Sequence, residues 1–443
     1  MDLDEKKENM QEQSIEPEDN RVNCKYGDKC YQKNPEHRRR YKHPSKEEQE
    51  KDSIENNGAS NGDNSNGHNK RKMSMDNGDK EDQSPVAKKQ NTSDSNEEIS
   101  SAEPQDNDIK VQSDEKVDDK KIVPVDSYEE AKKLIQKVFL VSMPNDFYKM
   151  YDFCSELNPS DPSNALKVAD LKLVGPYDIL NGLITQENAN STQLLTHWRY
   201  YYDPPEFQTT IKGNDKEGLH FGYWRDRPSS DPIFVALNSS EVSHKIKPYA
   251  ENIFGAIVAY LEARLKKANP FEKTGFTNLI AKLKAYTKKH NINLDIQSTR
   301  MRSREKNVVT RTIHGAGIVC PYNKKSQVGY RELSVSDNDL LKIIKKINDA
   351  KGDAKREEAR SELADVVRLA TIAGDECDFG TCLELGHNLL SSGSTHVQNA
   401  ALAMLNIAYT QLDRQEFLKI FEAHMKNRKK GCNLSALETS QSD

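Results

Sequence analysis

The sequence predicts an α+β fold, in which an antiparallel sheet carries a helical C-terminal layer and is preceded by a small zinc finger and a long disordered linker. Three observations support this organisation. Cysteines and histidines cluster near the N-terminus, about eighty residues after them lack Leu, Phe, Tyr, Trp and Cys, and the remaining chain alternates helical and strand-like hydrophobic patterns. Of the 443 residues, 35% are hydrophobic and 30% charged, which is too polar for one uniformly folded globule.

The first element is a group of four potential metal ligands within residues 20–45. The spacing Cys-x5-Cys-x6-His-x5-His supplies the donors of a closed tetrahedral zinc site, and the ligands are Cys24, Cys30, His37 and His43. A segment this short needs such a metal in order to fold. DNA-reading fingers have more closely spaced cysteines and about twelve residues before the first histidine, so this spacing disfavours sequence-specific DNA binding. The alternative is a basic tail that binds no metal.

The residues between these ligands narrow the class of finger. This stretch resembles the poly(ADP-ribose)-binding zinc finger. The pattern of that finger is a basic residue, Cys-x-aromatic-Gly-x-x-Cys, a histidine and a late aromatic-x-His. Besides the four ligands, the residues that match it are Arg21, Tyr26, Gly27 and Tyr41. The resemblance implies poly(ADP-ribose) as the ligand. Aromatic faces can stack on adenines and cations can pair with pyrophosphates, so the expected polymer-binding side chains are Tyr26, Tyr31, Lys33 and Arg38. Gln32 stands where the family usually carries a basic residue, which lowers the expected affinity.

The second element is the predicted linker, residues 46–123. From Pro44 to Ser127 there is no Leu, Phe, Tyr, Trp or Cys, so this stretch cannot bury enough apolar surface to offset its chain entropy. Two basic clusters, Lys70-Arg71-Lys72 and Lys88-Lys89, resemble a loose two-part nuclear import signal. A solvated charge run is an equally good interpretation of these clusters.

Net charge and cysteine usage bear on the binding partners and on the cellular compartment. With 65 basic and 70 acidic residues the net charge is −5, so basic character is local and the protein as a whole is no polyanion binder. There is no recognisable secretory leader and no apolar run of membrane-spanning length, which predicts an intracellular protein without a membrane partner. The seven cysteines are an odd number, and those outside the finger lack metal-ligand spacing, so we expect free thiols in a reducing compartment.

The folded body is expected over residues 124–430, followed by a disordered tail at 431–443. A capping box at Ser127-Tyr128-Glu129-Glu130 predicts a first helix, and apolar residues at helical spacing from Asp146 to Leu157 predict a second. Aromatic and β-branched runs then predict antiparallel strands, namely Trp198–Tyr202, Leu219–Trp224 and Pro232–Leu237. The aromatic density could also serve base stacking, but a sheet core is the better interpretation.

Helical patterns return after the predicted sheet. One runs from Ile253 to a stop near Asn269-Pro270 and another from Phe276 to His290, and a further strand is expected at 308–313. The following His314-Gly315-Ala316-Gly317 lacks the third glycine of a dinucleotide loop and predicts a tight turn. From Ser336 onward the pattern is helical, which gives the C-terminal layer on the sheet. The length allows one domain or two tightly joined halves.

Two short motifs in the C-terminal half carry the clearest functional signal. They are Val328-Gly329-Tyr330-Arg331-Glu332-Leu333 and Gly374-Asp375-Glu376-Cys377-Asp378-Phe379-Gly380. Together with residues 314–317 and 198–207 they resemble the histone PARylation factor family, in order and over essentially the whole folded portion. A polymer-binding finger ahead of such a body is similar to the arthropod form of that family.

The resemblance implies an accessory subunit, not an enzyme alone. Such a factor docks on a DNA-damage-activated poly(ADP-ribose) polymerase, which binds the NAD, and completes its active site for serine ADP-ribosylation of histones. By motif match Glu376 is the catalytic carboxylate, Asp375 its supporting neighbour, and Tyr330 with Arg331 the docking pair. The implied location is the nucleus, on chromatin at sites of DNA damage. The alternative function is a non-catalytic scaffold that reads poly(ADP-ribose).

The chemistry of serine agrees with this division of roles. An alcohol must lose a proton before it attacks NAD, whereas a carboxylate acceptor is already ionised, so only serine needs an added base. We expect neighbouring negative charge from Asp375, Asp378 and Glu384 to raise the pKa of Glu376 and to attract a lysine beside the target serine. The same acids make Cys377 a poor nucleophile.

Each motif also has a purely structural interpretation, without a role in catalysis or docking. The acidic cluster at 375–378 could be a solvated helix start, where negative charge is favourable. Tyr330 could be a strand-end tyrosine and Arg331 a surface cation paired with Glu332. A free-standing transferase or hydrolase finds no support, since no complete nucleotide loop, activated nucleophile or catalytic metal set is apparent.

Overall fold

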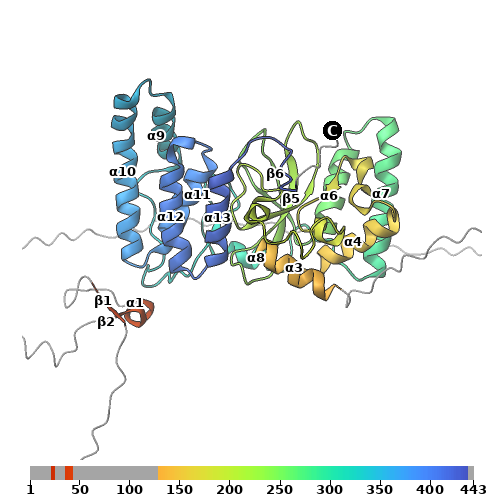
Figure 1. Ribbon diagram of the computed structural model, residues 1–443, viewed down its shortest axis with the longest axis horizontal. Coiled ribbons are helices and arrows are strands. Elements are labelled where there is room, and N and C mark those ends of the chain that lie inside the picture. Colours follow the sequence, from red (N-terminus) through yellow and green to blue (C-terminus); the bar gives the residue numbers. More distant parts are fainter. Residues whose placement is uncertain (1–20, 25–34, 43–127, 438–443) are drawn as a thin grey trace, which may run out of the picture. The chain divides into compact units, whose positions relative to one another are not determined.

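The computed structural model describes residues 21–24, 35–42 and 128–437 (Figure 1). Residues 128–437 are called the body below. The body has an antiparallel sheet with surrounding helices and a helical C-terminal layer, so the predicted α+β class is confirmed. The linker predicted at 46–123 lies outside the described residues.

Two amphipathic helices open the body. Helix α3 (Glu129–Phe139) buries Leu134, Ile135, Val138 and Phe139, and helix α4 (Asn145–Leu157) follows after a short connection. Tyr128 precedes α3 and provides no side-chain cap, and Ser127, the expected cap, lies outside the described residues. Leu140 ends α3 in the left-handed region at φ 58°, which turns the chain toward α4.

A five-stranded antiparallel sheet lies at the centre of this half. Its order is β3-β4-β5-β6-β7, with β3 at Lys172–Leu173, β4 at Phe207–Lys212, β5 at Leu219–Trp224, β6 at Phe234–Ser239 and β7 at Lys247–Ala250. All six residues of β5 are buried, as the aromatic run predicted, and β5 pairs with β6 from Leu219↔Ser239 to Trp224↔Phe234. Short helical turns complete this half: η3 (Pro162–Asn164), η4 (Lys167–Ala169), α5 (Tyr177–Leu180) and η5 (Thr192–Thr196).

The strand predicted at Trp198–Tyr202 is not formed. Trp198 adopts φ 56°, a left-handed conformation that interrupts an extended run, and the segment is an irregular turn. Its side chains are nevertheless core, because Tyr200 is fully buried and Arg199 donates to the carbonyl oxygens of Pro204 (2.8 Å) and Phe207 (3.0 Å). The aromatic pattern therefore identified burial correctly and backbone conformation wrongly.

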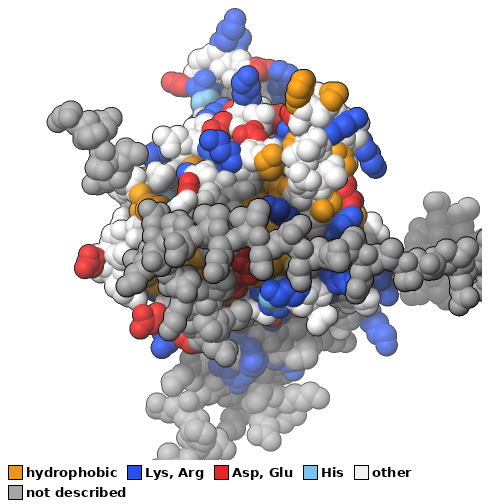
Figure 2. Space-filling model, turned by 90° about the vertical axis from the view of Figure 1, so that its right-hand side faces the viewer, with side chains coloured by type: hydrophobic (Ala, Val, Ile, Leu, Met, Phe, Trp, Pro, Cys, Tyr) orange, Lys and Arg blue, Asp and Glu red, His pale blue; other side chains and the backbone are white. Residues whose placement is uncertain are grey.

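Helices α6 (Ile253–Leu265), α7 (Pro270–Lys289) and α8 (Thr299–Glu305) cover this half. Helix α7 begins six residues earlier than predicted, because Asn269 caps it, Glu272 completes a capping box and Pro270 occupies the first turn. Pro270, expected only to stop the preceding helix, therefore also begins helix α7. Lysines fill much of the exposed face of α7, and Figure 2 shows the face of the molecule on the right of Figure 1, with Lys and Arg side chains scattered across it.

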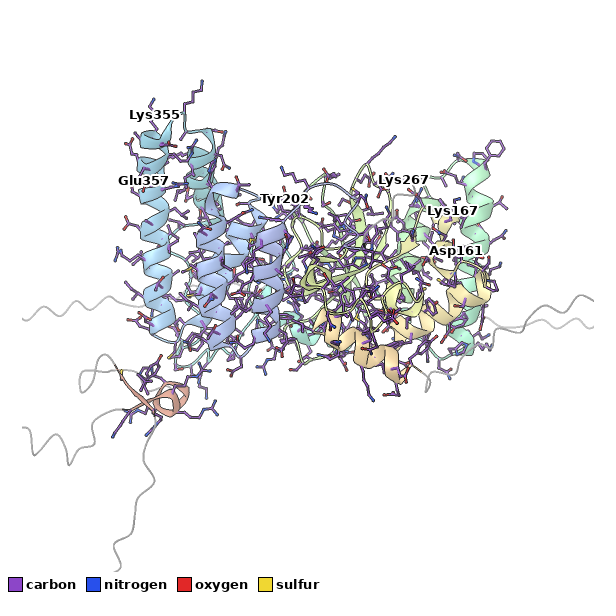
Figure 3. All side chains as sticks on the ribbon, viewed as in Figure 1. Asp161, Lys167, Tyr202, Lys267, Lys355 and Glu357 are labelled. Atoms are coloured by element: carbon purple, nitrogen blue, oxygen red, sulfur yellow. The ribbon has the colours of Figure 1, made fainter. Side chains whose placement is uncertain are left out.

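The C-terminal layer follows a two-stranded hairpin. Strands β8 (Val308–Thr310) and β9 (Ile318–Val319) flank the predicted turn, where Gly315 and Gly317 adopt φ 85° and 73°. Five helices stand side by side in this layer (Figure 1): α9 (Asp337–Asp349), α10 (Asp353–Asp375), α11 (Phe379–Ser391), α12 (Gln398–Gln411) and α13 (Gln415–Asn427), with η6 (Thr395–Val397) before α12. Figure 3 places Lys355 and Glu357 at the start of α10, the opposite end from Asp375.

The layer and the sheet half share one core. A single apolar cluster runs from Leu134 in α3 to Phe421 in α13. Buried Glu206 accepts hydrogen bonds from the Tyr409 hydroxyl (3.0 Å) and lies 3.3 Å from Nε2 of His387, so it joins the sheet half to α11 and α12. The sheet half and the C-terminal layer of the body are therefore packed on one continuous core.

The body also continues past its predicted end at residue 430. Leu434 is buried in a cluster with Val174, Trp198 and Tyr200, and its carbonyl oxygen accepts a hydrogen bond of 3.0 Å from the Trp198 amide. The Ala436 amide donates to Nδ1 of His197 at 2.9 Å. Residues 431–437, expected as part of a disordered tail, are packed against the body.

The described part of the finger is small. Strands β1 (Val22–Asn23) and β2 (Tyr41–Lys42) pair in parallel, and helix α1 (Pro35–Arg40) lies between them in sequence.

Among the residues that the structure describes, no helix combines the length and apolar character needed to cross a membrane.

Candidate functional site at the turn between helices α10 and α11

The acidic motif forms the turn between two helices of the layer. Asp375 is the last residue of α10, and Glu376 caps that helix with its amide donating to the carbonyl oxygens of Ile372 and Ala373. Cys377 reverses the chain in a left-handed conformation at φ 72°, and Asp378 precedes α11. Two of the three acids therefore stand at a helix C-terminus, where the helix dipole disfavours negative charge, so a helix-start preference does not explain them.

Asp378 ties this turn to the second motif. Its buried carboxylate accepts from the Gly329 amide at 2.8 Å and from Nε and Nη2 of Arg331 at 3.1 and 2.8 Å. The Gly380 amide donates back to the Gly329 carbonyl at 2.9 Å. Gly329 has φ 114°, and a Cβ there would lie 1.9 Å from the carbonyl oxygen of Pro321, so only glycine fits this approach.

Arg331 lies between the two carboxylates of the turn. Its Nη2 donates to Glu376 Oε2 at 2.5 Å as well as to Asp378, although half of the Arg331 side chain (51%) remains exposed. Burial opposes the charge of Arg331, but the hydrogen bonds and charges of Glu376 and Asp378 raise its pKa above the usual value. The partner of Arg331 is thus the acidic motif, not the neighbouring Glu332 suggested by local spacing.

Tyr330 points the other way, toward α11. Its hydroxyl donates to Glu384 Oε2 at 3.1 Å, and its half-buried ring meets Tyr322 edge to face at 6.0 Å. Glu384 also accepts from the Thr310 hydroxyl at 2.9 Å. Burial raises the pKa of the Glu384 carboxyl to about 7.

The expected electrostatics therefore need revision. From the sequence, Asp378 and Glu384 are expected to act on Glu376 as negative charges. In the structure Arg331 compensates Asp378 and contacts Glu376 directly, whereas Glu384 is buried and bound to Tyr330 and Thr310. Asp375 is exposed at the end of α10. The acidic cluster therefore contains a cation, Arg331, whose place there the sequence does not reveal.

Two of the four expected zinc ligands of the finger, Cys24 and His37, lie within the described residues. Cys24 Sγ lies 3.5 Å from His37 Nε2. Zinc bonds of about 2.3 Å to sulfur and about 2.0 Å to nitrogen at a tetrahedral angle place two ligands about 3.5 Å apart, so this pair fits zinc. Arg38 is exposed on α1, and the other expected residues, Cys30, His43, Tyr26, Tyr31 and Lys33, lie outside the described residues.

Comparison with known proteins identifies the family. The family model of Histone PARylation factor 1 matches residues 130–428, which is most of the chain and nearly all of the body. The chain belongs to the histone PARylation factor 1 family. Histone PARylation factor 1 of Mus musculus is 39% identical over 311 residues, which cover 70% of this chain and 90% of the mouse protein. The Danio rerio protein of the same name is 37% identical over 302 residues, covering 68% and 86%.

The N-terminal module has its own match. The PBZ domain model matches residues 21–46, the segment that holds all four expected ligands. This member of the histone PARylation factor 1 family therefore carries a PBZ zinc finger ahead of the family body.

In the sequence, only the family resemblance links the two motifs to one site. The structure brings them together, with Arg331 and Glu376 in direct contact although 45 residues separate them. The role of Glu384 as an anchor of Tyr330 was missed. A signal was present, because Glu384 is the one acid in the otherwise apolar and neutral helix α11. A lone acid on a buried helix usually has a specific partner.

Proposed function

We propose that this chain is an accessory factor that docks on a DNA-damage-activated poly(ADP-ribose) polymerase and supplies Glu376 as the general base for serine ADP-ribosylation of histones. Membership of the histone PARylation factor 1 family supports the proposal. The observation that carries it is the contact between Arg331 and Glu376, because it joins the expected docking residue to the expected base.

The proposed chemistry assigns one proton transfer to this chain. The partner polymerase binds NAD, and the serine oxygen attacks the ribose carbon that bears nicotinamide. Nicotinamide leaves, and the Glu376 carboxylate accepts the serine proton. Such a base is useful only where the serine and the ribose carbon lie close together, which requires the cleft of the polymerase. The chain is therefore not an enzyme alone.

The cation at Glu376 explains why docking and catalysis would be coupled. A carboxylate beside a guanidinium is stabilised in its charged form and is a weaker base. In the structure Arg331 is the guanidinium that contacts Glu376. If a carboxylate of the polymerase binds Arg331, the hydrogen bond to Glu376 is released and its basicity increases in the complex. Docking would then activate the base as well as place it.

The exposed acid of the turn, Asp375, suits a basic substrate. Asp375 extends the negative charge around Glu376, and a histone tail carries lysines next to serines. We assign to Asp375 this supporting role, without a proton transfer of its own.

The finger adds a second binding activity to the proposal. The PBZ domain match and the Cys24–His37 geometry support zinc held by Cys24, Cys30, His37 and His43. Poly(ADP-ribose) would bind through Tyr26, Tyr31, Lys33 and Arg38. This activity would retain the factor on newly modified chromatin in the nucleus during DNA repair.

A serine-labelling assay tests the catalytic part. The full chain, the polymerase, damaged DNA, labelled NAD and a histone peptide are combined, and Glu376→Gln is compared with Glu357→Gln at the opposite end of the same helix. We expect Glu376→Gln to co-purify with the polymerase and to lose serine labelling, by about 100-fold or more. Glu357→Gln should behave as the wild type. Wild-type labelling by Glu376→Gln would exclude the base assignment and leave the non-catalytic scaffold as the function.

A further inference from the structure

Glu384 is the acidic residue of the otherwise uncharged helix α11, and its surroundings indicate a specific structural role. It lies in the middle of α11, in which nearly every residue is buried, and only 6% of Glu384 is exposed. Burying a carboxylate is costly unless its oxygens are hydrogen-bonded. Glu384 meets this requirement with one donor for each oxygen: Thr310 for Oε1 at 2.9 Å and Tyr330 for Oε2 at 3.1 Å.

These two donors come from separate elements. Thr310 ends strand β8, and Tyr330 belongs to the segment that crosses the acidic turn. The adjacent Arg331 is fixed independently, because its amide donates to the Thr381 hydroxyl at 3.0 Å and its carbonyl accepts from the same hydroxyl at 2.6 Å. The backbone of the docking segment is therefore held by Thr381, and the direction of the Tyr330 ring is set through Glu384.

We infer that Glu384 is a positioning residue for docking: its ionised carboxylate clamps the Tyr330 hydroxyl and so presents the ring to the polymerase. The inference rests on the proposed function, in which Tyr330 docks. Glu384 itself is buried beneath the docking segment and acts through Tyr330 and not by contact with the partner.

The ionised and protonated carboxyl groups hold the tyrosine differently. An ionised carboxylate accepts from both hydroxyls, and hydrogen bonds to a charged acceptor are roughly twice as strong as neutral ones. A protonated carboxyl must place its own hydrogen toward a hydroxyl oxygen, so one of the two hydroxyls has to turn its hydrogen elsewhere. Loss of the charge thus loosens the clamp.

The groups around Glu384 place this change near neutral pH. Burial is the main cause of its raised pKa of about 7, and the negative charges of Asp337 at the start of α9 and Glu332 in the docking segment add to it. The hydrogen bonds from Thr310 and Tyr330 act in the opposite direction. Docking should therefore strengthen as pH rises through about 7.

The first experiment tests the clamp without the polymerase. The full chain is labelled with carbon-13 at the tyrosine ζ carbon, and the Tyr330 signal is assigned by its loss in Tyr330→Phe. We expect this signal to shift with a midpoint near pH 7 in the wild type and to stay constant in Glu384→Gln. A signal that does not move between pH 6 and 8 in the wild type, or that moves equally in Glu384→Gln, would overturn the inference.

The second experiment measures affinity for the polymerase between pH 6 and 8 at constant ionic strength. Relative to Glu357→Gln, we expect Glu384→Gln to bind about three- to tenfold more weakly at pH 8 and equally well at pH 6, because the wild type gains its advantage on ionisation. Thr310→Val, which removes the other donor, should shift the midpoint upward. An unchanged affinity of Glu384→Gln at both pH values would contradict the positioning role.

A third variant separates this inference from the proposed function. Tyr330→Ala should abolish tight docking. If Tyr330→Ala binds normally, the docking assignment fails, and the positioning role of Glu384 fails with it. If Tyr330→Ala loses binding while Glu384→Gln keeps wild-type affinity and pH dependence, only the inference about Glu384 is wrong.

Discussion

Arg331 Nη2 lies 2.5 Å from Glu376 Oε2 and 2.8 Å from Asp378 Oδ2, so one nitrogen of a single guanidinium donates to two of the three carboxylates at the α10–α11 turn. The Asp378 side chain is 5% exposed and the Glu376 side chain is 15% exposed. The more buried contact is structural, and the more exposed one can be exchanged. A partner that competes for Arg331 would therefore release Glu376 before it disturbs the fold.

Replacing Arg331 with alanine should weaken binding to the polymerase by about thirtyfold or more, as expected for a central interface arginine. The matched variant is Arg331→Lys, which keeps the charge but lacks the planar fork and should give an intermediate loss. Binding of the full chain to the polymerase, measured by titration, provides the test. Equal affinity of wild type and Arg331→Ala would remove Arg331 from the interface.

The variant Asp378→Asn should destabilise the body by about 1–3 kcal/mol, because the amide cannot accept from both Gly329 and Arg331 as the buried carboxylate does. Its control is Asp365→Asn on the exposed face of α10, where a surface ion pair with Arg368 contributes less than about 1 kcal/mol. Urea unfolding followed by circular dichroism gives both free energies. Similar losses for the two variants would mean that the tie between the motifs contributes little to stability.

The raised pKa of Glu384 predicts how the stability of the body varies with pH. Between the ordinary glutamate pKa of 4.5 and about 7, the folded chain keeps a proton that the unfolded chain releases. The free energy of unfolding should therefore fall as pH rises through this interval and level off above it. Glu384→Gln cannot ionise, so its stability relative to the wild type should improve by about 3 kcal/mol from pH 4.5 to pH 8.

Thermal or urea unfolding at several pH values checks this prediction. A difference between variant and wild type that is constant from pH 4.5 to 8 would contradict it. Together with the docking experiments, the result would show a residue that costs stability in its ionised form while it improves binding, a combination that a purely structural acid would not produce.

The finger makes an independent prediction. Cys24→Ala should lose zinc and weaken retention on poly(ADP-ribose), because a three-ligand site no longer closes around the metal. Zinc content by atomic absorption and binding to immobilised polymer measure the two effects. Cys432→Ala, a partly exposed thiol of the body, is the control and should retain both. Full polymer retention by Cys24→Ala would indicate that the finger, with Gln32 at a usually basic position, does not bind the polymer.

The sequence predicted the α+β class, strands β5 and β6 of the sheet, strand β8 of the hairpin and most helices, because hydrophobic period and caps are local properties. The errors arose where tertiary context decides. Trp198–Tyr202 has the composition of a strand, but its side chains are buried around a turn, and Pro270 starts α7 because Asn269 caps it. Residues 431–437 are polar enough to suggest a tail, yet the buried Leu434 and the hydrogen bond from Ala436 to His197 hold them to the rest of the body.

The site was predictable in its membership but not in its connections. Two motifs could be named from the sequence because they match a family pattern. Spacing along the chain cannot reveal that Arg331 reaches across 45 residues to Glu376, or that Tyr330 reaches 54 residues to Glu384. These contacts depend on how α10, α11 and the 328–333 segment pack, and they change the electrostatics from an acidic cluster to an ion-paired one.

The seating of Leu434 against Trp198 also has a consequence for biogenesis. During translation the aromatic hollow around Trp198 emerges from the ribosome more than two hundred residues before the segment that covers it. This surface of the nascent chain therefore remains uncovered until the segment that packs on it has been synthesised. The last packing step of the body follows the synthesis of residue 437. We expect molecular chaperones to bind the growing chain during that interval.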